Sequence, residues 1–460
     1  MGRKRRRQEK DTDRMPQEKR CNHNPPETVP TLRITSINDN CLEHIFKKLE
    51  FIDLLNMADS SKCFKNALNL AFASHFRGVK VDINSQFVRI NELFKVTYKN
   101  NMLKCGTGDC TISIHDGSIG LKLLRCFGHL ISNLSVYHCD ERFQCKVNRY
   151  INNYCFTSLT EININWYPKD LKNSFPNIEI VRFQDLNCKT LEAMDDLKTW
   201  CPNVQRLEFI ESTAINSCRI GHHLSHLQHL KIRLNRGSFT ETGLKNVENM
   251  LQMNPQLRSL SVSGYNITAN YFSSIRSHLQ SLESLSIDCR KRTFFNTNDV
   301  IQLNALKTFK IHFVDEFCDP LPKIPFVFNQ LDTLSIKACQ IRIDTNFIHF
   351  LKTHRRSLIK LNLSNWVYPN FYPFYGGNDS KFHDAMKLLK KIDMHGCQFS
   401  VHQIEEMLKK CKSLDTFVFT PAMDTDLETI RKHIDTEWFI VERCFGTVKI
   451  ERQTLPAETN

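Results

Sequence analysis

The chain has 460 residues, a hydrophobic fraction of 41% and a formal net charge of +13. It is long enough to bury a large core, and too long for one compact domain without internal repetition. No run of eighteen apolar residues occurs, so we expect no transmembrane helix. The basic excess favours acidic partners but is too evenly spread to indicate nucleic acid.

The first 33 residues are charged, contain Asn and Pro, and have few large apolar side chains, which predicts a disordered tail. No apolar segment follows the basic start, so we do not expect a secretory signal. The 18 scattered cysteines, none in a C-x-x-C pair, are then expected to be reduced thiols in the nucleus and/or cytoplasm. A basic run typical of nuclear import, which could also be a plain solvated tail, comprises Arg3, Lys4, Arg5, Arg6 and Arg7.

Residues 34–77 predict three short helices. Leu42, Ile45, Phe46 and Leu49 fall at i, i+3, i+4 and i+7, which places them on one face of the first helix. Three helices in so short a segment are near the lower limit for an independent core. The unit therefore needs a partner surface or a neighbouring domain.

The stretch from Ile37 to Phe64 resembles an F-box, with Ile37-Asn38 in place of the usual Leu-Pro and Lys62-Cys63 in reversed order. The resemblance implies docking on the Skp adaptor, and through it on the cullin and RING subunits, of an SCF-type ubiquitin ligase. The alternative is that the apolar face packs on the domain that follows. An exposed apolar stripe is expected to comprise Leu42, Ile45, Phe46, Leu49 and Leu54. The residues expected to bind the Skp adaptor are Ile37, Leu42, Ile45, Phe46, Leu49, Leu54, Leu55 and Phe64.

A sequence motif of the form L-x-x-L-x-I recurs through the rest of the chain. Leu257, Leu282, Leu306 and Leu331 stand 25, 24 and 25 residues apart, which is typical of leucine-rich repeats. The motif predicts an α/β solenoid shaped as a horseshoe, with parallel strands on the concave face and helices outside. We place strand cores at 79–81, 112–114, 134–136, 162–164, 181–183, 207–209, 230–232, 260–262, 285–287, 309–311, 334–336, 361–363, 392–394 and 417–419.

Two segments interrupt this repeat pattern. The aromatic insertion 366–377 predicts a loop on one rim, which either anchors a partner or packs on its own solenoid. Residues 438–453 predict a hairpin that closes the open end of the core. The predicted organisation is a tail (1–33), an F-box (34–77), a solenoid (78–437), a cap hairpin (438–453) and a second tail (454–460).

The sequence predicts no enzyme and no cofactor. It lacks the phosphate-binding motifs G-x-x-x-x-G-K-[ST] and G-x-G-x-x-G. The histidines at 222, 223, 226 and 229 have no companion acid or thiol nearby, so we expect no metal. Cysteine or asparagine recurs eight residues after the leading apolar position, where we expect it to bond the backbone of the next coil: Cys139, Asn235, Cys339 and Cys397.

Outward strand positions on the concave wall are the predicted substrate surface. Their basic side chains favour an acidic or phosphorylated protein segment, although outward positions are polar in any such fold. Nucleic acid is a weaker alternative, because the wall lacks interleaved aromatic residues. The predicted contact residues are Arg182, Arg206, His229, Lys231, Arg233, Ser261, Ser286, Lys310, His312 and Lys337.

These patterns together predict a non-catalytic substrate receptor of an SCF-type E3 ubiquitin ligase. It would bind the Skp adaptor through the F-box and an unidentified protein substrate through the repeats. The alternative is a repeat scaffold or inhibitor that binds a protein partner outside any ligase, with the helices only capping the solenoid.

Overall fold

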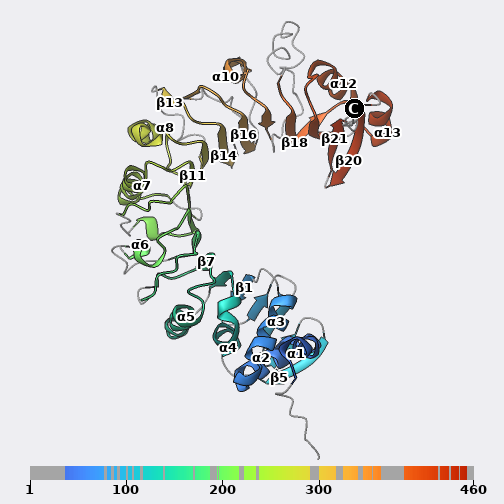
Figure 1. Cartoon of the computed structure of the whole chain (residues 1–460). Coiled ribbons are helices and arrows are strands. Elements are labelled where there is room, and N and C mark those ends of the chain that lie inside the picture. The colour runs from blue at the N-terminus through green and yellow to red at the C-terminus, as the bar shows by residue number, and fades with distance from the viewer. Residues whose placement is uncertain are drawn as a thin grey trace, which may run out of the picture.

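The computed structural model describes residues 37–452, with gaps at 77–79, 84–86, 91–93, 100–101, 106–107, 114–117, 138–139, 169–170, 187–193, 195, 217–221, 235–237, 291–299, 317–324, 340–344, 355, 364–387, 423–424, 435–436 and 445. Within these residues the chain forms a small helical unit followed by an open arc of strands and helices (Figure 1). Strands line the inside of the arc and helices lie on its outside.

The helical unit consists of α1 (Asp39–Phe46), α2 (Phe51–Ser60), η2 (Lys62–Phe64) and α3 (Lys65–His75). Asn38 caps α1 by accepting a hydrogen bond from the Cys41 backbone N–H at 2.9 Å. The Phe46 ring lies edge-on to Phe64, with ring centroids 5.7 Å apart. The apolar faces of the three helices thus close on one another.

A ladder of thirteen parallel strands runs through the described part of the arc. A triplet such as Leu-x-Ile recurs along the ladder, and its two apolar side chains point into the core while the middle one points out. The strands are β1 (Lys80–Ile83), β6 (Asn133–Val136), β7 (Glu161–Ile164), β8 (Ile180–Gln184), β9 (Arg206–Ile210), β10 (His229–Arg233), β11 (Ser259–Ser263), β12 (Ser284–Cys289), β14 (Thr308–Glu316), β16 (Thr333–Cys339), β17 (Lys360–Asn362), β18 (Lys391–Phe399) and β19 (Thr416–Pro421).

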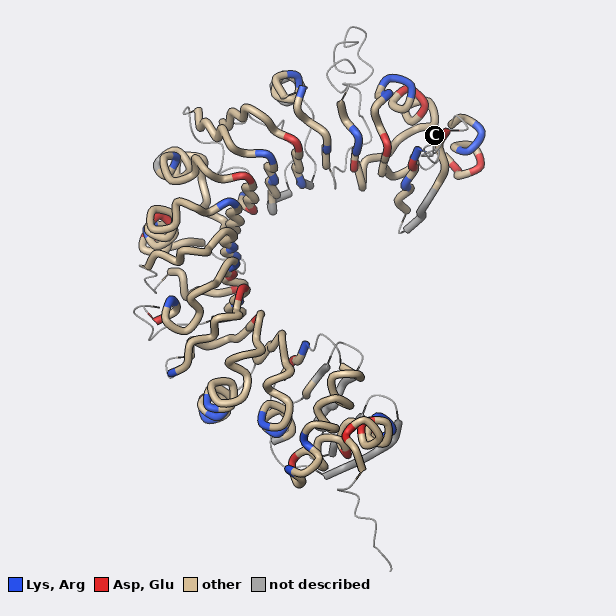
Figure 2. The backbone as a smooth tube through the Cα atoms, viewed as in Figure 1, with Lys and Arg blue, Asp and Glu red and all other residues tan. Residues whose placement is uncertain are grey.

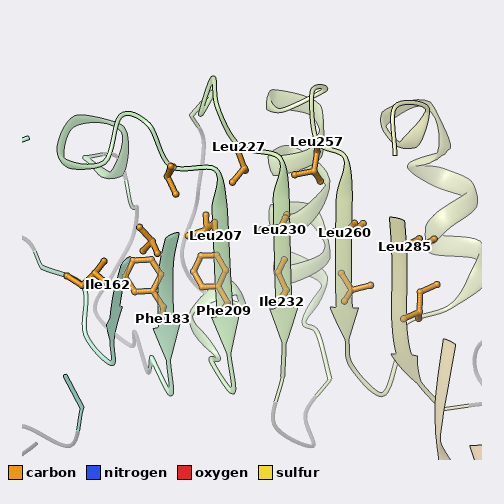
Figure 3. Close-up of a cluster of buried hydrophobic side chains, with 14 of the residues drawn as sticks. Ile162, Phe183, Leu207, Phe209, Leu227, Leu230, Ile232, Leu257, Leu260 and Leu285 are labelled. Atoms are coloured by element: carbon orange, nitrogen blue, oxygen red, sulfur yellow. The ribbon is translucent and has the colours of Figure 1, made fainter. Parts of the chain in front are cut away.

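The core is one continuous layer between the strands and the outer segments. Figure 3 shows side chains of successive strands stacked in register, among them Leu207, Leu230 and Leu260. All three are at most 2% exposed. Because each coil buries its apolar side against its neighbours, coils depend on one another for stability.

The outer layer is made of short helices separated by extended segments (Figure 1). Helices are about 10 Å thick, whereas strands are about 4.8 Å apart, so this arrangement bends the stack toward its strand side. The outer elements are α4 (Ser118–Phe127), η3 (Gly128–Leu130), α5 (Glu141–Tyr154), α6 (Leu197–Trp200), η4 (Ala214–Asn216), α7 (Glu241–Met253), α8 (Ala269–Ser274), η5 (Arg276–Leu279), β13 (Ile301–Leu303), β15 (Phe326–Phe328), α10 (Thr345–His354), α12 (Val401–Lys410) and α13 (Leu427–His433).

Strand direction reverses at both ends of the ladder. At one end β1 pairs antiparallel with β2 (Phe87–Ile90), which leads to β3 (Phe94–Lys99), β4 (Met102–Cys105) and β5 (Gly108–Ser113). At the other end β19 pairs antiparallel with β21 (Thr447–Arg452), which forms a hairpin with β20 (Trp438–Cys444).

The prediction of a repeat strand at 112–114 is wrong for its described residues. Ile112 and Ser113 belong to β5, which pairs antiparallel with β4 outside the parallel ladder. The strand that precedes β6 in the ladder is β1, and the two pair directly from Lys80 opposite Asn133 to Ile83 opposite Val136. An alternating apolar pattern predicts a strand but does not distinguish the two directions of pairing.

Candidate functional site

Most of the apolar face predicted on the first helices is buried. Leu42 and Phe46 are 2% and 1% exposed and fill the core of the helical unit. Leu54, Leu55 and Phe64 are buried with them. The prediction that Leu42, Phe46 and Leu54 belong to an exposed apolar face is therefore wrong, because α1, α2 and α3 already cover one another. Leu55 and Phe64, which were predicted to bind the adaptor, are covered in the same way.

One large apolar residue of α1 does face solvent. Ile45 is 48% exposed, and the partly buried Ile37 and Leu49 lie near the two ends of the same helix. Cys41 lies one helical turn before Ile45 and is also exposed. The open surface at α1, here called the α1 face, is defined by Ile37, Cys41, Ile45 and Leu49.

The opposite side of the helical unit is packed on the first coil of the solenoid. The Phe72 ring of α3 stacks on Phe127 of α4, with centroids 4.1 Å apart. Asp59 of α2 makes ion pairs with Lys122, at 3.2 Å, and with Arg125 of α4. These contacts hold the helical unit on the arc while the α1 face stays open.

On the concave wall, the predicted basic patch of β8 to β10 is partly neutralised. Arg182 makes ion pairs with Glu208 of β9, at 3.0 Å, and with Glu161 of β7. Glu208 is 7% exposed and stands opposite Lys231 of β10. The prediction counted the bases here without these two acids, so a purely basic patch is wrong.

His229 adds no fixed charge to this patch. Burial lowers the pKa of its imidazole, and the nearby Arg206 and Arg258 lower it further, against an opposing effect of Glu208. The ring is therefore neutral at pH 7. Arg206 and Lys231 are half-buried and Arg233 is exposed on the same surface.

Further along the concave wall, two of the predicted basic residues have no acidic partner among the residues that the structure describes. Lys310 and Lys337 are exposed, and neither makes an ion pair within the described part of the chain. His312 lies 3.7 Å from Asp288. Ser261 and Ser286 are half-buried neighbours on β11 and β12. The structure thus places all ten predicted contact residues on ladder strands, with Ser261 and Ser286 between the bases of β8 to β10 and those of β14 and β16. Figure 2 shows Lys and Arg together with Asp and Glu along the strand side of the arc.

Sequence reasoning missed Glu161 and Glu208 as partners of Arg182. The signal was available in the repeat spacing, because aligning successive strands puts Glu208 directly beside Arg182. It also missed Lys122, Arg125 and Asp59, whose meeting depends on how α2 lies against α4 and is not set by any local pattern.

Several cysteine and histidine side chains are buried or hydrogen-bonded to the backbone. Burial raises the pKa of Cys201 and raises that of Cys411 to about 12, so both thiols stay protonated. Cys397 donates from Sγ to the Leu363 carbonyl at 3.7 Å. It thus bonds the backbone, as expected, but that of the preceding coil and not of the next one. His223 bonds the Met253 carbonyl through Nδ1 at 2.8 Å. Among the described residues, no group of three or more His, Cys, Asp or Glu side chains is placed to hold a metal ion.

Some predictions fall outside the described residues. They are the tails 1–33 and 454–460 with the basic run 3–7, the aromatic insertion 366–377, Cys139, Asn235 and the side chain of Cys339. No helix in the described ranges combines the length and the apolar character needed to cross a membrane.

Comparison with known protein families identifies the helical unit. The F-box domain matches residues 34–70, which include α1, α2, η2 and the first part of α3. The chain therefore carries an F-box domain at the start of a large sheet of mostly parallel strands. F-box domains generally bind Skp1 within SCF complexes, and F-box proteins are typically non-catalytic adaptors.

The solenoid has distant structural counterparts. A TLR13–ssRNA13 complex matches with 14% identity, 64% coverage of this chain, 54% coverage of that chain and a TM-score of 0.30. The Drosophila Toll–Spatzle complex matches with 11% identity, 78% and 56% coverage and a TM-score of 0.28. The chain spans about half the length of these proteins. No curated protein matches the chain significantly.

Proposed function

We propose that this protein is a substrate-recognition subunit of an SCF-type E3 ubiquitin ligase. The F-box domain would bind the Skp adaptor, and the concave wall would bind a protein substrate. The observation that supports this most is the F-box itself, with its α1 face open to solvent and its other side fixed to the solenoid.

The proposed action needs no catalytic group on this chain. A receptor of this kind holds a substrate near a ubiquitin-charged enzyme carried by the rest of the ligase, which raises the effective concentration of substrate lysines there. The contacts from Asp59 and Phe72 to α4 would keep the substrate at a fixed distance from the adaptor.

Co-expression with the Skp adaptor, followed by size-exclusion chromatography, tests the adaptor part of the proposal. We expect a stoichiometric complex with the wild-type chain. Ile45→Asp should abolish it, because a carboxylate would then be buried in an apolar contact without a partner. Val300→Asp is the matched control, since Val300 is similarly exposed at 51% and lies on the solenoid.

The same experiment distinguishes the ligase subunit from the alternative function, a repeat scaffold outside the ligase. If the wild-type chain and Ile45→Asp both elute alone, folded and soluble, the protein is a repeat scaffold outside the ligase. If the complex forms but Ile45→Asp retains it, the adaptor uses another surface than the α1 face.

A further inference from the structure

The middle of the concave wall carries a surface of hydroxyl groups. Each of the four adjacent strands β11, β12, β14 and β16 has two successive outward positions that lie in register with those of its neighbours, and these two rows contain only serine and threonine apart from Lys310. Within the described part of the chain, none of their side chains bonds another protein group. This surface, here called the hydroxyl floor, comprises Ser259, Ser261, Ser284, Ser286, Thr308, Thr333 and Ser335.

Lysine side chains lie within the hydroxyl floor and on both of its sides. Lys310 replaces a hydroxyl in the second row, between Ser286 and Ser335. Lys231 borders the floor opposite Ser261 on β10, and Lys360 borders it opposite Thr333 on β17. Lysine side chains are longer than serine side chains, so a ligand that contacts these hydroxyl groups is also within reach of the lysine ammonium groups.

Three acids near the floor each lie beside a polar or basic partner. Glu208 is held by Arg182 at 3.0 Å, and Asp288 lies 3.7 Å from His312. Asp393 accepts hydrogen bonds from the Asn362 side chain and the His395 backbone N–H, both at 3.2 Å. Lys310 and Lys360 have no ion-pair partner among the described residues, so their charge is available to a ligand.

We infer that the hydroxyl floor and its lysines bind a short protein segment that carries clustered negative charge. Carboxylate and phosphate oxygens accept hydrogen bonds from serine hydroxyls and from lysine ammonium groups, and bonds to charged groups are the stronger kind. This inference rests on the proposed function, because it names the substrate class that the concave wall would take.

The dimensions favour a segment of extended chain. The floor crosses three strand spacings, roughly 15 Å, which is the length of about four extended residues. A single-stranded nucleic acid fits less well, because such ligands stack on aromatic side chains. The described outward positions from β9 to β18 contain no Phe, Tyr or Trp.

Binding of peptide libraries to the full-length protein tests the inference. The probes are three libraries with random flanks and a fixed central pair of phosphoserines, glutamates or serines. We expect retention of a charged library to exceed that of the serine library by at least about tenfold, the effect of one charged hydrogen bond. The better retained of the charged libraries tells phosphate from carboxylate recognition.

Three variants locate the site. Lys310→Ala should reduce retention of the charged library about tenfold. Ser286→Val should also reduce it, because it removes a hydroxyl and fills the floor without changing the charge. Lys245→Ala is the control, since it removes a lysine from the outer helix α7.

Several outcomes overturn the inference. They are equal retention of all three libraries, no retention of any, an equal effect of Lys245→Ala, or tighter binding of a single-stranded RNA that is insensitive to Ser286→Val. Adaptor binding by the same preparations shows whether the proposed function has failed as well. A chain that binds the adaptor but no charged library disproves only the inference.

Discussion

At the residue scale, Phe46 and Ile45 are adjacent in sequence and opposite in role. Phe46 is 1% exposed and packs on Phe64, so Phe46→Ala should destabilise the F-box by about 3–5 kcal/mol. Ile45→Asp changes an exposed position and should alter stability by about 0.5 kcal/mol or less. Hydrogen exchange of the α1 to α3 amides measures both effects. Equal protection in the two variants would contradict the assignment of Phe46 to the core.

His354 gives a residue-scale prediction on pH. It is 4% exposed, its ring lies 4.8 Å from that of Phe350, and burial lowers its pKa below the usual 6.5. On acidification the unfolded chain binds a proton at this residue before the folded chain does, so stability is lost as the pH falls below about 6.5.

The His354→Leu variant removes this contribution to acid sensitivity. We expect the urea midpoint of the wild type to fall more between pH 7.5 and pH 5.5 than that of the variant. His129 and His229, whose pKa values are also lowered, remain in both proteins and cancel in the comparison. Parallel loss of stability in the two proteins would show that His354 takes up no extra proton on unfolding.

At the element scale, the C-terminal hairpin protects the last strand of the ladder. β21 pairs along β19, and its Val448 and Ile450 are at most 1% exposed. A chain that ends at Ile434 would expose the edge of β19 together with apolar surface, which favours aggregation. We expect it to have a lower melting temperature and to form larger particles in light scattering.

A chain that ends at Arg452 is the matched control for this truncation, because it keeps both strands of the hairpin. It should melt and scatter like the full chain. A stable, monodisperse chain ending at Ile434 would show that β19 needs no cover.

Most elements of the ladder could be predicted from the sequence, because each one repeats a local pattern. Leu260 and Val262, for example, fall two residues apart on a strand whose buried face follows from alternation alone. The antiparallel strands β2 to β5 could not be predicted in this way, since they break the repeat. The burial of Leu42 was missed because a helical stripe shows which residues share a face but not what covers that face.

At the scale of the whole molecule, the F-box and the first coil should behave as one unit. Removing both bases in Lys122→Ala/Arg125→Ala breaks the ion pairs with Asp59 and leaves the stacked rings of Phe72 and Phe127 in place. The three side chains are partly exposed, so the loss should be about 1 kcal/mol or less.

Hydrogen exchange measures this coupling. We expect protection of α2, α3 and α4 to fall together by no more than about tenfold, while α7 stays unchanged as the internal control. Independent exchange of α3 and α4 in the wild type would show that the two parts open separately, and the distance from adaptor to substrate would then not be fixed.

The reversal of strand direction at both ends also bears on how such a chain can change its length in evolution. A duplicated coil inserted between β11 and β12 would meet parallel neighbours on both sides and could pair with each. A coil added after β19 would meet the antiparallel β21 instead. Growth is therefore confined to the interior, where each new coil moves the far part of the wall away from the F-box by one strand spacing, about 4.8 Å.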